Sequence, residues 1–182
     1  MLRLSSSESK IRRIVLSPVA ALFLFGAENN AAAVPDNPTA VISRAAPEFS
    51  RLDLNHRQVS MAAYRGKVVL LNFWATWCSS CLIEMPHFVQ WQQAYGKRGL
   101  QVIGVSMDDD VHPVRAAYQK YRLNYPVVMG DEELGEMYGG VLGLPVTFLI
   151  DRSGKIRFVH QGGVRLNQIR SEMEILLHQN VE

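Results

Sequence analysis

The chain has 182 residues, of which 48% are hydrophobic and 20% are charged. That is enough for one globular domain with a full hydrophobic core and a modest extension. The formal net charge of +2 comes from the N-terminus, because the residues after position 33 include fifteen basic and fifteen acidic side chains. This balance excludes the strongly basic surface typical of nucleic-acid-binding proteins, so no nucleic-acid partner is expected.

The first 33 residues are typical of an export signal or an N-terminal anchor. Lys10, Arg12 and Arg13 precede an apolar run over residues 14–27, and a stretch of small residues ends at Ala33. The run is shorter than the roughly 20 residues that a membrane span needs, which favours cleavage after Ala33 over membrane anchoring through residues 14–27. We therefore expect a periplasmic or otherwise extracytoplasmic protein.

Residues 34–46 are rich in Pro and Ala and are expected to form a linker, and residues 47–182 are expected to form one domain. Hydrophobic periodicity and turn residues predict the elements of this domain. In chain order these are a hairpin over 49–53 and 58–60, a strand over 67–74, a helix over 78–95, a strand over 100–106, a helix over 111–121, a strand over 125–128, a helix over 132–138, strands over 146–150 and 156–161, and a helix over 166–178.

This order of elements predicts an α/β fold in which helices flank both faces of a mixed β-sheet. The run Val68–Leu71 is apolar at every position, which is typical of a central strand that is buried on both faces. Asp108, Asp109 and Asp110 precede the helix predicted to begin near Val111, and we expect them to form its solvated start.

The chain contains two cysteines, Cys78 and Cys81, three positions apart. A disulfide that closes so short a loop adds little stability, so the pair is better explained by redox chemistry. Cys78 lies where the predicted strand ends and the predicted helix begins, and unpaired N–H groups at a helix start favour a thiolate. Cys81, one turn further on, would resolve a mixed disulfide formed by Cys78.

The segment Phe73–Cys81, followed by Glu84 and Pro86, resembles the thioredoxin superfamily. The closer match is to its exported TlpA/ResA-like branch, which is similar to the redoxins of cytochrome c maturation. The resemblance covers most of residues 46–180. It implies a thioredoxin fold with an N-terminal β-hairpin and a central αβ insertion, and no cofactor beyond a redox-active Cys78–Cys81 disulfide.

The resemblance also implies a surface that binds the substrate. The residues Gly143–Thr147 match a loop that carries a cis-proline in this superfamily, so Pro145 is expected to be cis and to face the active site. Pro145 would expose the backbone of Leu144 for pairing with a client peptide, and Trp77 would shape the apolar surroundings. An ordinary proline at the entry of a strand is the alternative interpretation of Pro145.

Asn72 stands where thioredoxins carry a buried aspartate, and an amide cannot titrate. The resemblance assigns the role of base toward Cys81 to Glu84 instead. A solvated carboxylate on a helix surface is the alternative for Glu84. The hydroxyls of Ser79 and Ser80 could donate hydrogen bonds to the Cys78 thiolate.

Together these features predict an exported thiol-disulfide oxidoreductase that reduces protein disulfides. Its partners would be clients such as apocytochrome c or general periplasmic proteins, and a membrane thiol-electron donor. Oxidation of clients stays open, because the same pair can run in either direction. The alternative is a copper-binding metallochaperone of thioredoxin fold, since two thiolates can hold Cu(I). No other metal site is expected, because the five histidines are scattered, at surface or boundary positions. A thiol peroxidase is disfavoured because Cys78 lacks the threonine-x-x-cysteine context of that class.

Overall fold

The computed structural model describes residues 39–163 and 165–179. The predicted signal or anchor over residues 1–33 lies outside this part of the chain. None of the helices within the described ranges is both long enough and apolar enough to cross a membrane.

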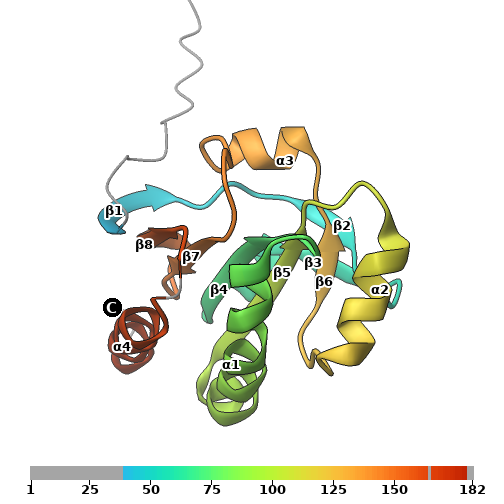
Figure 1. Ribbon diagram of the computed structural model, residues 1–182. Helices are drawn as coiled ribbons and strands as arrows, with labels where there is room; N and C mark the ends of the chain where they lie inside the picture. Colours follow the sequence, from blue (N-terminus) through green and yellow to red (C-terminus); the bar gives the residue numbers. More distant parts are fainter. Residues whose placement is uncertain (1–38, 164, 180–182) are drawn as a thin grey trace, which may run out of the picture. The chain divides into compact units, whose positions relative to one another are not determined.

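A six-stranded mixed sheet in the order β1-β8-β7-β4-β5-β6 forms the centre of the domain (Figure 1). Strands β4, β5 and β6 run parallel to one another, whereas β7 pairs antiparallel with β4 and with β8. Every residue of β4 is buried, including Asn72, and the apolar run Val68–Leu71 at its start predicts such a central strand. The strands are β1 (Thr39–Ala45), β4 (Val68–Trp74), β5 (Leu100–Ser106), β6 (Val127–Met129), β7 (Val146–Ile150) and β8 (Lys155–Gln161).

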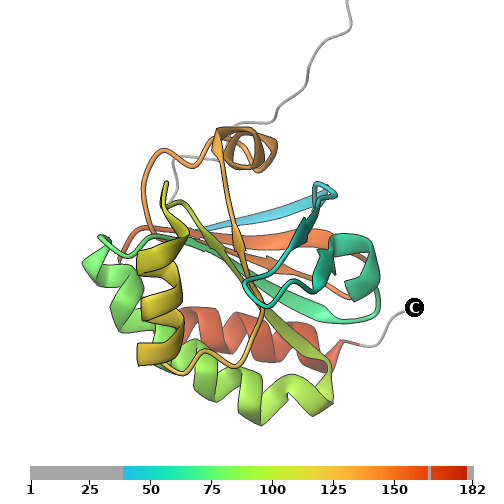
Figure 2. The ribbon, with the colours of Figure 1, turned by 90° about the vertical axis from the view of Figure 1, so that its right-hand side faces the viewer.

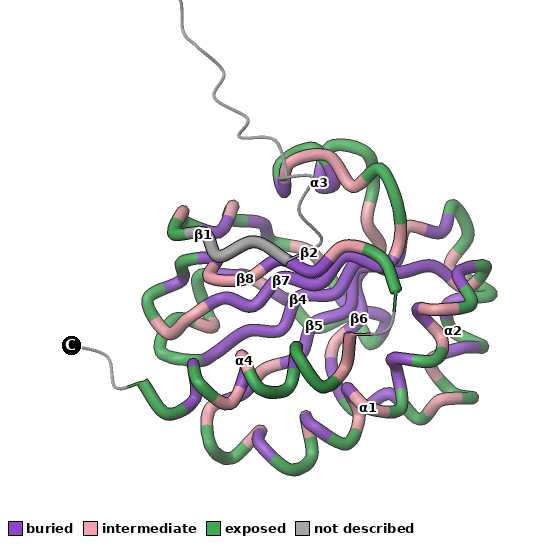
Figure 3. Tube along the Cα trace, turned by 60° about the vertical axis from the view of Figure 1, so that its left-hand side comes forward, coloured by how far each residue is buried: buried purple, intermediate pink, exposed green. Residues whose placement is uncertain are grey.

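Helices cover both faces of this sheet, as predicted. In Figure 2, helices α1, α2 and α4 lie on one side, and α3 lies on the other. The buried apolar side chains accordingly form two clusters, one beneath α1, α2 and α4 and the other beneath α3 and the N-terminal hairpin. Figure 3 shows that the buried positions concentrate along the central strands. The helices are α1 (Ser79–Tyr95), α2 (Val111–Lys120), α3 (Glu132–Met137) and α4 (Leu166–His178).

The two additions to the thioredoxin fold that the resemblance implied are both present. Strands β2 (Ser50–Leu52) and β3 (Gln58–Ser60) form a separate antiparallel hairpin, followed by a short 3-10 helix, η1 (Met61–Tyr64). Helix α2 and strand β6 form the αβ insertion, and β6 extends the sheet beyond β5.

The predicted linker over residues 34–46 is wrong for its second half. Residues 39–45 form β1, the edge strand of the sheet, which pairs antiparallel with β8 from Thr39 opposite His160 to Ala45 opposite Lys155. The prolines before and after this segment suggested a linker, but the β-branched residues between them favour an extended backbone, whose N–H and C=O groups pair with those of β8. The domain therefore includes residue 39 rather than beginning at 47, and residues 34–38 lie outside the described ranges.

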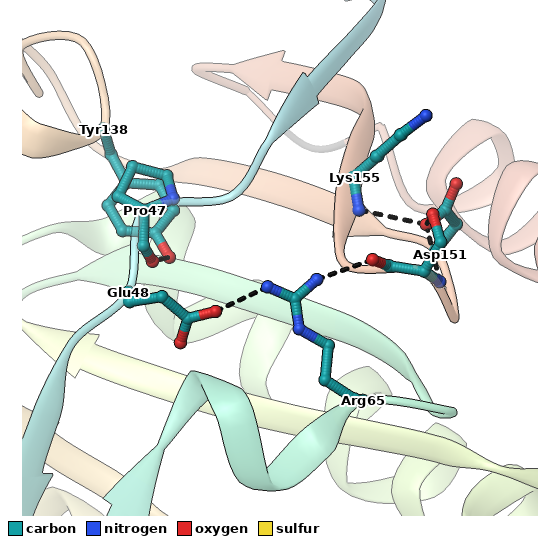
Figure 4. Close-up of polar contacts among 7 residues, drawn as sticks. Pro47, Glu48, Arg65, Tyr138, Asp151 and Lys155 are labelled. Atoms are coloured by element: carbon teal, nitrogen blue, oxygen red, sulfur yellow. Dashed lines mark hydrogen bonds and ion pairs between the residues drawn. The ribbon is translucent and has the colours of Figure 1, made fainter.

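The segment between β1 and β2 is fastened to the rest of the domain by polar contacts (Figure 4). The Tyr138 hydroxyl donates to the carbonyl of Pro47 at 2.9 Å, and Glu48 forms an ion pair with Arg65 at 2.5 Å. Arg65 also donates to the carbonyl of Ser153 in the turn between β7 and β8. Gly154 in this turn has a φ of 80°, a left-handed conformation that favours glycine, and a Cβ there would displace the Arg65 guanidinium from its present position.

Candidate functional site

The two cysteines form a disulfide at the junction of β4 and α1, with their Cα atoms 5.3 Å apart. Cys78 is the N-cap residue of α1, and its sulfur accepts a hydrogen bond from the Cys81 amide at 3.2 Å. Cys78 is 7% exposed and Cys81 is 1% exposed. Cys78 is therefore the sulfur that a client can reach, and Cys81 is the sulfur that lies behind it.

The position of Cys78 favours its thiolate once the disulfide is reduced. The first turn of a helix presents unpaired amides, and its dipole places partial positive charge at this end. Of the two serines between the cysteines, Ser80 brings its hydroxyl 3.5 Å from the Cys78 sulfur, whereas the Ser79 side chain is exposed and, among the described residues, forms no hydrogen bond with that sulfur. The hydroxyl of Ser80 adds a second donor close to the developing charge.

Glu84 lies in α1, three residues after Cys81, and is 1% exposed. The alternative interpretation of Glu84 as a solvated surface carboxylate is therefore wrong. Within the described part of the chain, its Oε2 atom has no hydrogen-bond partner. Burial raises the pKa of Glu84 from the usual 4.5 to about 7. A buried carboxyl with such a pKa can take up or release a proton near neutral pH, and residues three apart share one face of a helix.

Pro145 lies directly before β7, and the Leu144–Pro145 peptide bond is cis, as expected. In the pairing of β4 with β7, Phe73 stands opposite Val146, so Pro145 adjoins the end of β4 from which the chain enters the disulfide turn. Pro145 is buried, and its carbonyl accepts from the Gly162 amide at 2.8 Å. In the described structure, no backbone hydrogen bond engages Leu144.

Two large apolar side chains stand exposed on the segments that flank the disulfide and Pro145. Trp77, directly before Cys78, is 69% exposed, and Leu142, in the loop that leads to Pro145, is fully exposed. Sequence reasoning missed Leu142. The available signal was an apolar pair, Val141 and Leu142, placed between glycines in a loop. Trp74, by contrast, is buried in the core.

Two buried polar residues complete the surroundings of the site. Asn72 of β4 donates to the Thr147 hydroxyl of β7 at 2.9 Å, so it links the two strands without a titratable group. Asp108, expected at a solvated helix start, is instead 7% exposed. Its carboxylate faces the turn before Cys78, and only Asp110 caps α2, accepting from the His112 amide. The expectation failed for Asp108 because Thr76, whose amide donates to its carboxylate, lies 32 residues earlier in the chain. The sequence around Asp108 does not show that these two residues meet.

Among residues 39–163 and 165–179, no three His, Cys, Asp or Glu side chains come together in a way that could hold a metal ion. One histidine differs from the expected surface or boundary placement. His160 of β8 is buried, and its Nε2 atom lies 2.6 Å from a carboxylate oxygen of Glu172 in α4.

A thioredoxin fold with a Cys-x-x-Cys disulfide at the start of the helix after its central strand defines a thiol-disulfide oxidoreductase. The family model described as AhpC/TSA matches residues 42–159, and the chain belongs to this family.

Known proteins agree with this class. The chain is 31% identical over 168 residues to the thiol-disulfide oxidoreductase ResA of Geobacillus thermodenitrificans, covering 91% of this chain and 97% of the relative. It is also 31% identical to ResA of Bacillus subtilis, covering 72% of this chain and 73% of that one. Among solved structures, a thiol:disulfide interchange protein of the thioredoxin family from Chlorobium tepidum superposes with a TM-score of 0.69 at 29% identity, covering 76% of this chain and 99% of that one. The expected TlpA/ResA-like resemblance is thus confirmed.

The raised pKa of Glu84 predicts a specific dependence of stability on pH. The folded protein holds this proton more tightly than the unfolded chain, so stability falls as pH rises from 4.5 through about 7. Glu84→Gln removes the titration. We expect the free energy of unfolding of the variant, relative to that of the wild type, to be about 2 kcal/mol higher at pH 8 than at pH 5. Urea unfolding of the oxidised proteins measures this difference.

Glu133→Gln, at an exposed position of α3, is the matched control and should track the wild type at both pH values. Parallel stability curves for the wild type and Glu84→Gln would show that Glu84 ionises as an ordinary surface carboxylate.

Proposed function

We propose that the protein works outside the cytoplasm as a reductase of protein disulfides. The observation that carries this proposal is the asymmetric dithiol site, in which a reachable Cys78 caps a helix and a buried Cys81 is followed one turn later by a buried, protonatable Glu84. The relatives named thiol-disulfide oxidoreductase support the chemistry.

The cycle consists of two disulfide exchanges, the first started by Cys78 and the second by Cys81. The Cys78 thiolate attacks one sulfur of a client disulfide, a mixed disulfide forms, and the second client sulfur leaves as a thiolate. The Cys81 thiolate then attacks Cys78, the Cys78–Cys81 disulfide forms, and the first client sulfur leaves as a thiolate. Two electrons pass to the client, which ends as a dithiol once its thiolates are protonated.

Glu84 supplies the base for the second exchange. Cys81 is 1% exposed, so bulk water has little access to its proton, whereas Glu84 lies on the same face of α1. A base with a pKa near the working pH combines a useful fraction of the ionised form with sufficient basicity. Asn72 cannot take this role, because its amide does not titrate and is committed to Thr147.

The client is held as an extended segment beside Pro145. The backbone of Leu144, which bonds to no other backbone group of residues 39–163 and 165–179, provides a donor and an acceptor for strand-like pairing, and such pairing depends little on the client sequence. The exposed side chains of Trp77 and Leu142 offer apolar contacts to the client on the two adjoining segments.

Export and resetting follow from the sequence rather than from the described residues. The basic and apolar N-terminal segment supports export, either with cleavage after Ala33 or with anchoring through residues 14–27. A reductase in an oxidising compartment needs a continuous supply of electrons, which a membrane thiol donor would deliver. Apocytochrome c, whose haem-binding cysteines must be reduced, and general periplasmic proteins are the proposed clients.

The two cysteines should differ in what their loss does. Cys78→Ala removes the attacking sulfur, so we expect no turnover and no covalent adduct with a disulfide-containing client. Cys81→Ala leaves the attack intact and removes resolution, so we expect a stable mixed disulfide on Cys78, detected by mass spectrometry and released by dithiothreitol. Turnover at the wild-type rate by either variant would contradict the proposed cycle.

Glu84→Gln should slow the second exchange and leave the first unchanged. We expect the resolution of a chromogenic mixed disulfide on Cys78 to be about a hundredfold slower than in the wild type. In the wild type, the rate should rise with pH through about 7, where Glu84 loses its proton. If the resolution rate of Glu84→Gln had the same magnitude and the same pH midpoint as that of the wild type, another group would be the base.

The direction of electron flow is tested by the reduction potential of the Cys78–Cys81 pair, equilibrated against glutathione or dithiothreitol buffers. A reductase should give a value at or below about −270 mV, the value of thioredoxin. A value near about −120 mV would mark an oxidant of client thiols and would overturn the proposed direction.

A further inference from the structure

Asp108 lies two residues after the end of β5 and turns its carboxylate toward the end of the neighbouring strand β4. The carboxylate accepts from the Thr76 amide at 3.0 Å, from the Thr76 hydroxyl, and from the Ser106 hydroxyl at 2.7 Å. Ser106 in turn accepts from the Asp108 amide. Three donors thus converge on one buried anionic side chain, and such charge-assisted bonds are stronger than bonds between neutral groups.

Thr76 occupies the turn that delivers Cys78 to the start of α1. The Cys78 amide donates to the Ala75 carbonyl at 3.1 Å, which closes the turn around Thr76. On the other side, the Met107 amide donates to the Trp74 carbonyl at 2.8 Å. The end of β4 and the turn after it are therefore joined to the segment that follows β5 by one backbone hydrogen bond and by the Asp108 carboxylate. The carboxylate contacts Thr76, which lies two residues before the attacking Cys78.

The three consecutive aspartates differ in what they contact. Asp109 is exposed and makes no hydrogen bond or ion pair in the described structure, and Asp110 caps α2. Asp108 alone among them contacts the turn before Cys78. Without its carboxylate, the Thr76 amide would lose its acceptor at a half-buried position, and the turn could relax toward other conformations.

We propose that Asp108 is a positioning residue for Cys78. Through its bonds to Thr76, Asp108 holds the turn before Cys78 in a fixed position against the first turn of α1. In that position, the Cys81 amide donates to the Cys78 sulfur at 3.2 Å. A helix start stabilises a thiolate only when the sulfur is held against its amides, so loosening the turn weakens that stabilisation. The inference rests on the proposed nucleophilic role of Cys78.

The sign of the change in thiolate formation separates positioning from the effect of charge. A carboxylate near a thiol disfavours the thiolate, so loss of the charge alone would make Cys78 ionise at lower pH. Loss of the alignment has the opposite effect, because the thiolate loses its amide donors. A role confined to global stability would leave the ionisation of Cys78 in the folded protein unchanged.

The test compares Asp108→Ala with the matched control Asp109→Ala, which removes the same charge from the adjacent residue. The rate at which iodoacetamide alkylates Cys78 in the reduced proteins is followed against pH, with the label assigned to Cys78 by mass spectrometry. For Asp108→Ala we expect the pH midpoint to rise by about one unit and the rate below the midpoint to fall about tenfold. Asp109→Ala should keep the wild-type midpoint.

A second pair of variants covers the case in which Asp108→Ala does not fold. Thr76→Val removes the hydroxyl bond to Asp108, and Thr76→Ser retains it. We expect Thr76→Val to raise the midpoint and Thr76→Ser to restore the wild-type value. A midpoint that is unchanged or lower in folded Asp108→Ala, or equal midpoints for the two Thr76 variants, would overturn the inference. A wild-type Cys78 whose midpoint is that of an ordinary thiol would instead overturn the proposed function.

Discussion

The junction between β4 and α1 is the constraint on which the rest of the structure depends. A disulfide exchange needs a sulfur held at the open amides of a helix start, and β4 brings the chain to that point from the middle of the sheet. Because β4 is buried at every position and is paired with β5 and β7, its end has little freedom to move. The sheet and its covering helices thus serve as a rigid support for one short turn.

This support also brings polar groups into the interior around the turn. Asn72 and Thr147 satisfy each other across β4 and β7, and Asp108 satisfies the donors of Thr76 and Ser106. Glu84 differs, because one of its oxygens is buried without a hydrogen-bond partner among the described residues, and the burial raises its pKa to about 7. A carboxyl buried in this way destabilises the fold once it ionises. Active sites that need a base near neutral pH are places where such destabilising burial is found.

The main elements of the fold could be predicted because their signals are local. The apolar run of β4, the periodic apolar positions of α4, and the Cys78–Cys81 spacing each lie within one sequence window. Strand β1 was missed because its partner β8 lies more than a hundred residues away, and an open strand edge leaves no mark in the segment that will cover it. The family resemblance was needed to anticipate the cis bond before Pro145 and the buried position of Glu84.

Asp108 and Leu142 show what the sequence could not reveal about the site. An aspartate before a helix is usually a cap, and the choice between capping α2 and bonding Thr76 is made by tertiary contacts. An apolar residue in a loop can be covered or exposed, so Leu142 became informative only through its full exposure.

The small exposed area of Cys78 has a consequence for the selection of clients. In-line attack on a disulfide requires the client sulfur to approach along the axis of the new bond, and a cysteine residue that is 7% exposed leaves a narrow approach. Disulfides fixed within a compact domain cannot bend into this approach, whereas those on loose or unfinished chains can. The geometry of a single atom would thus sort clients by their state of folding, and mature disulfide-bonded neighbours in the same compartment would be left intact.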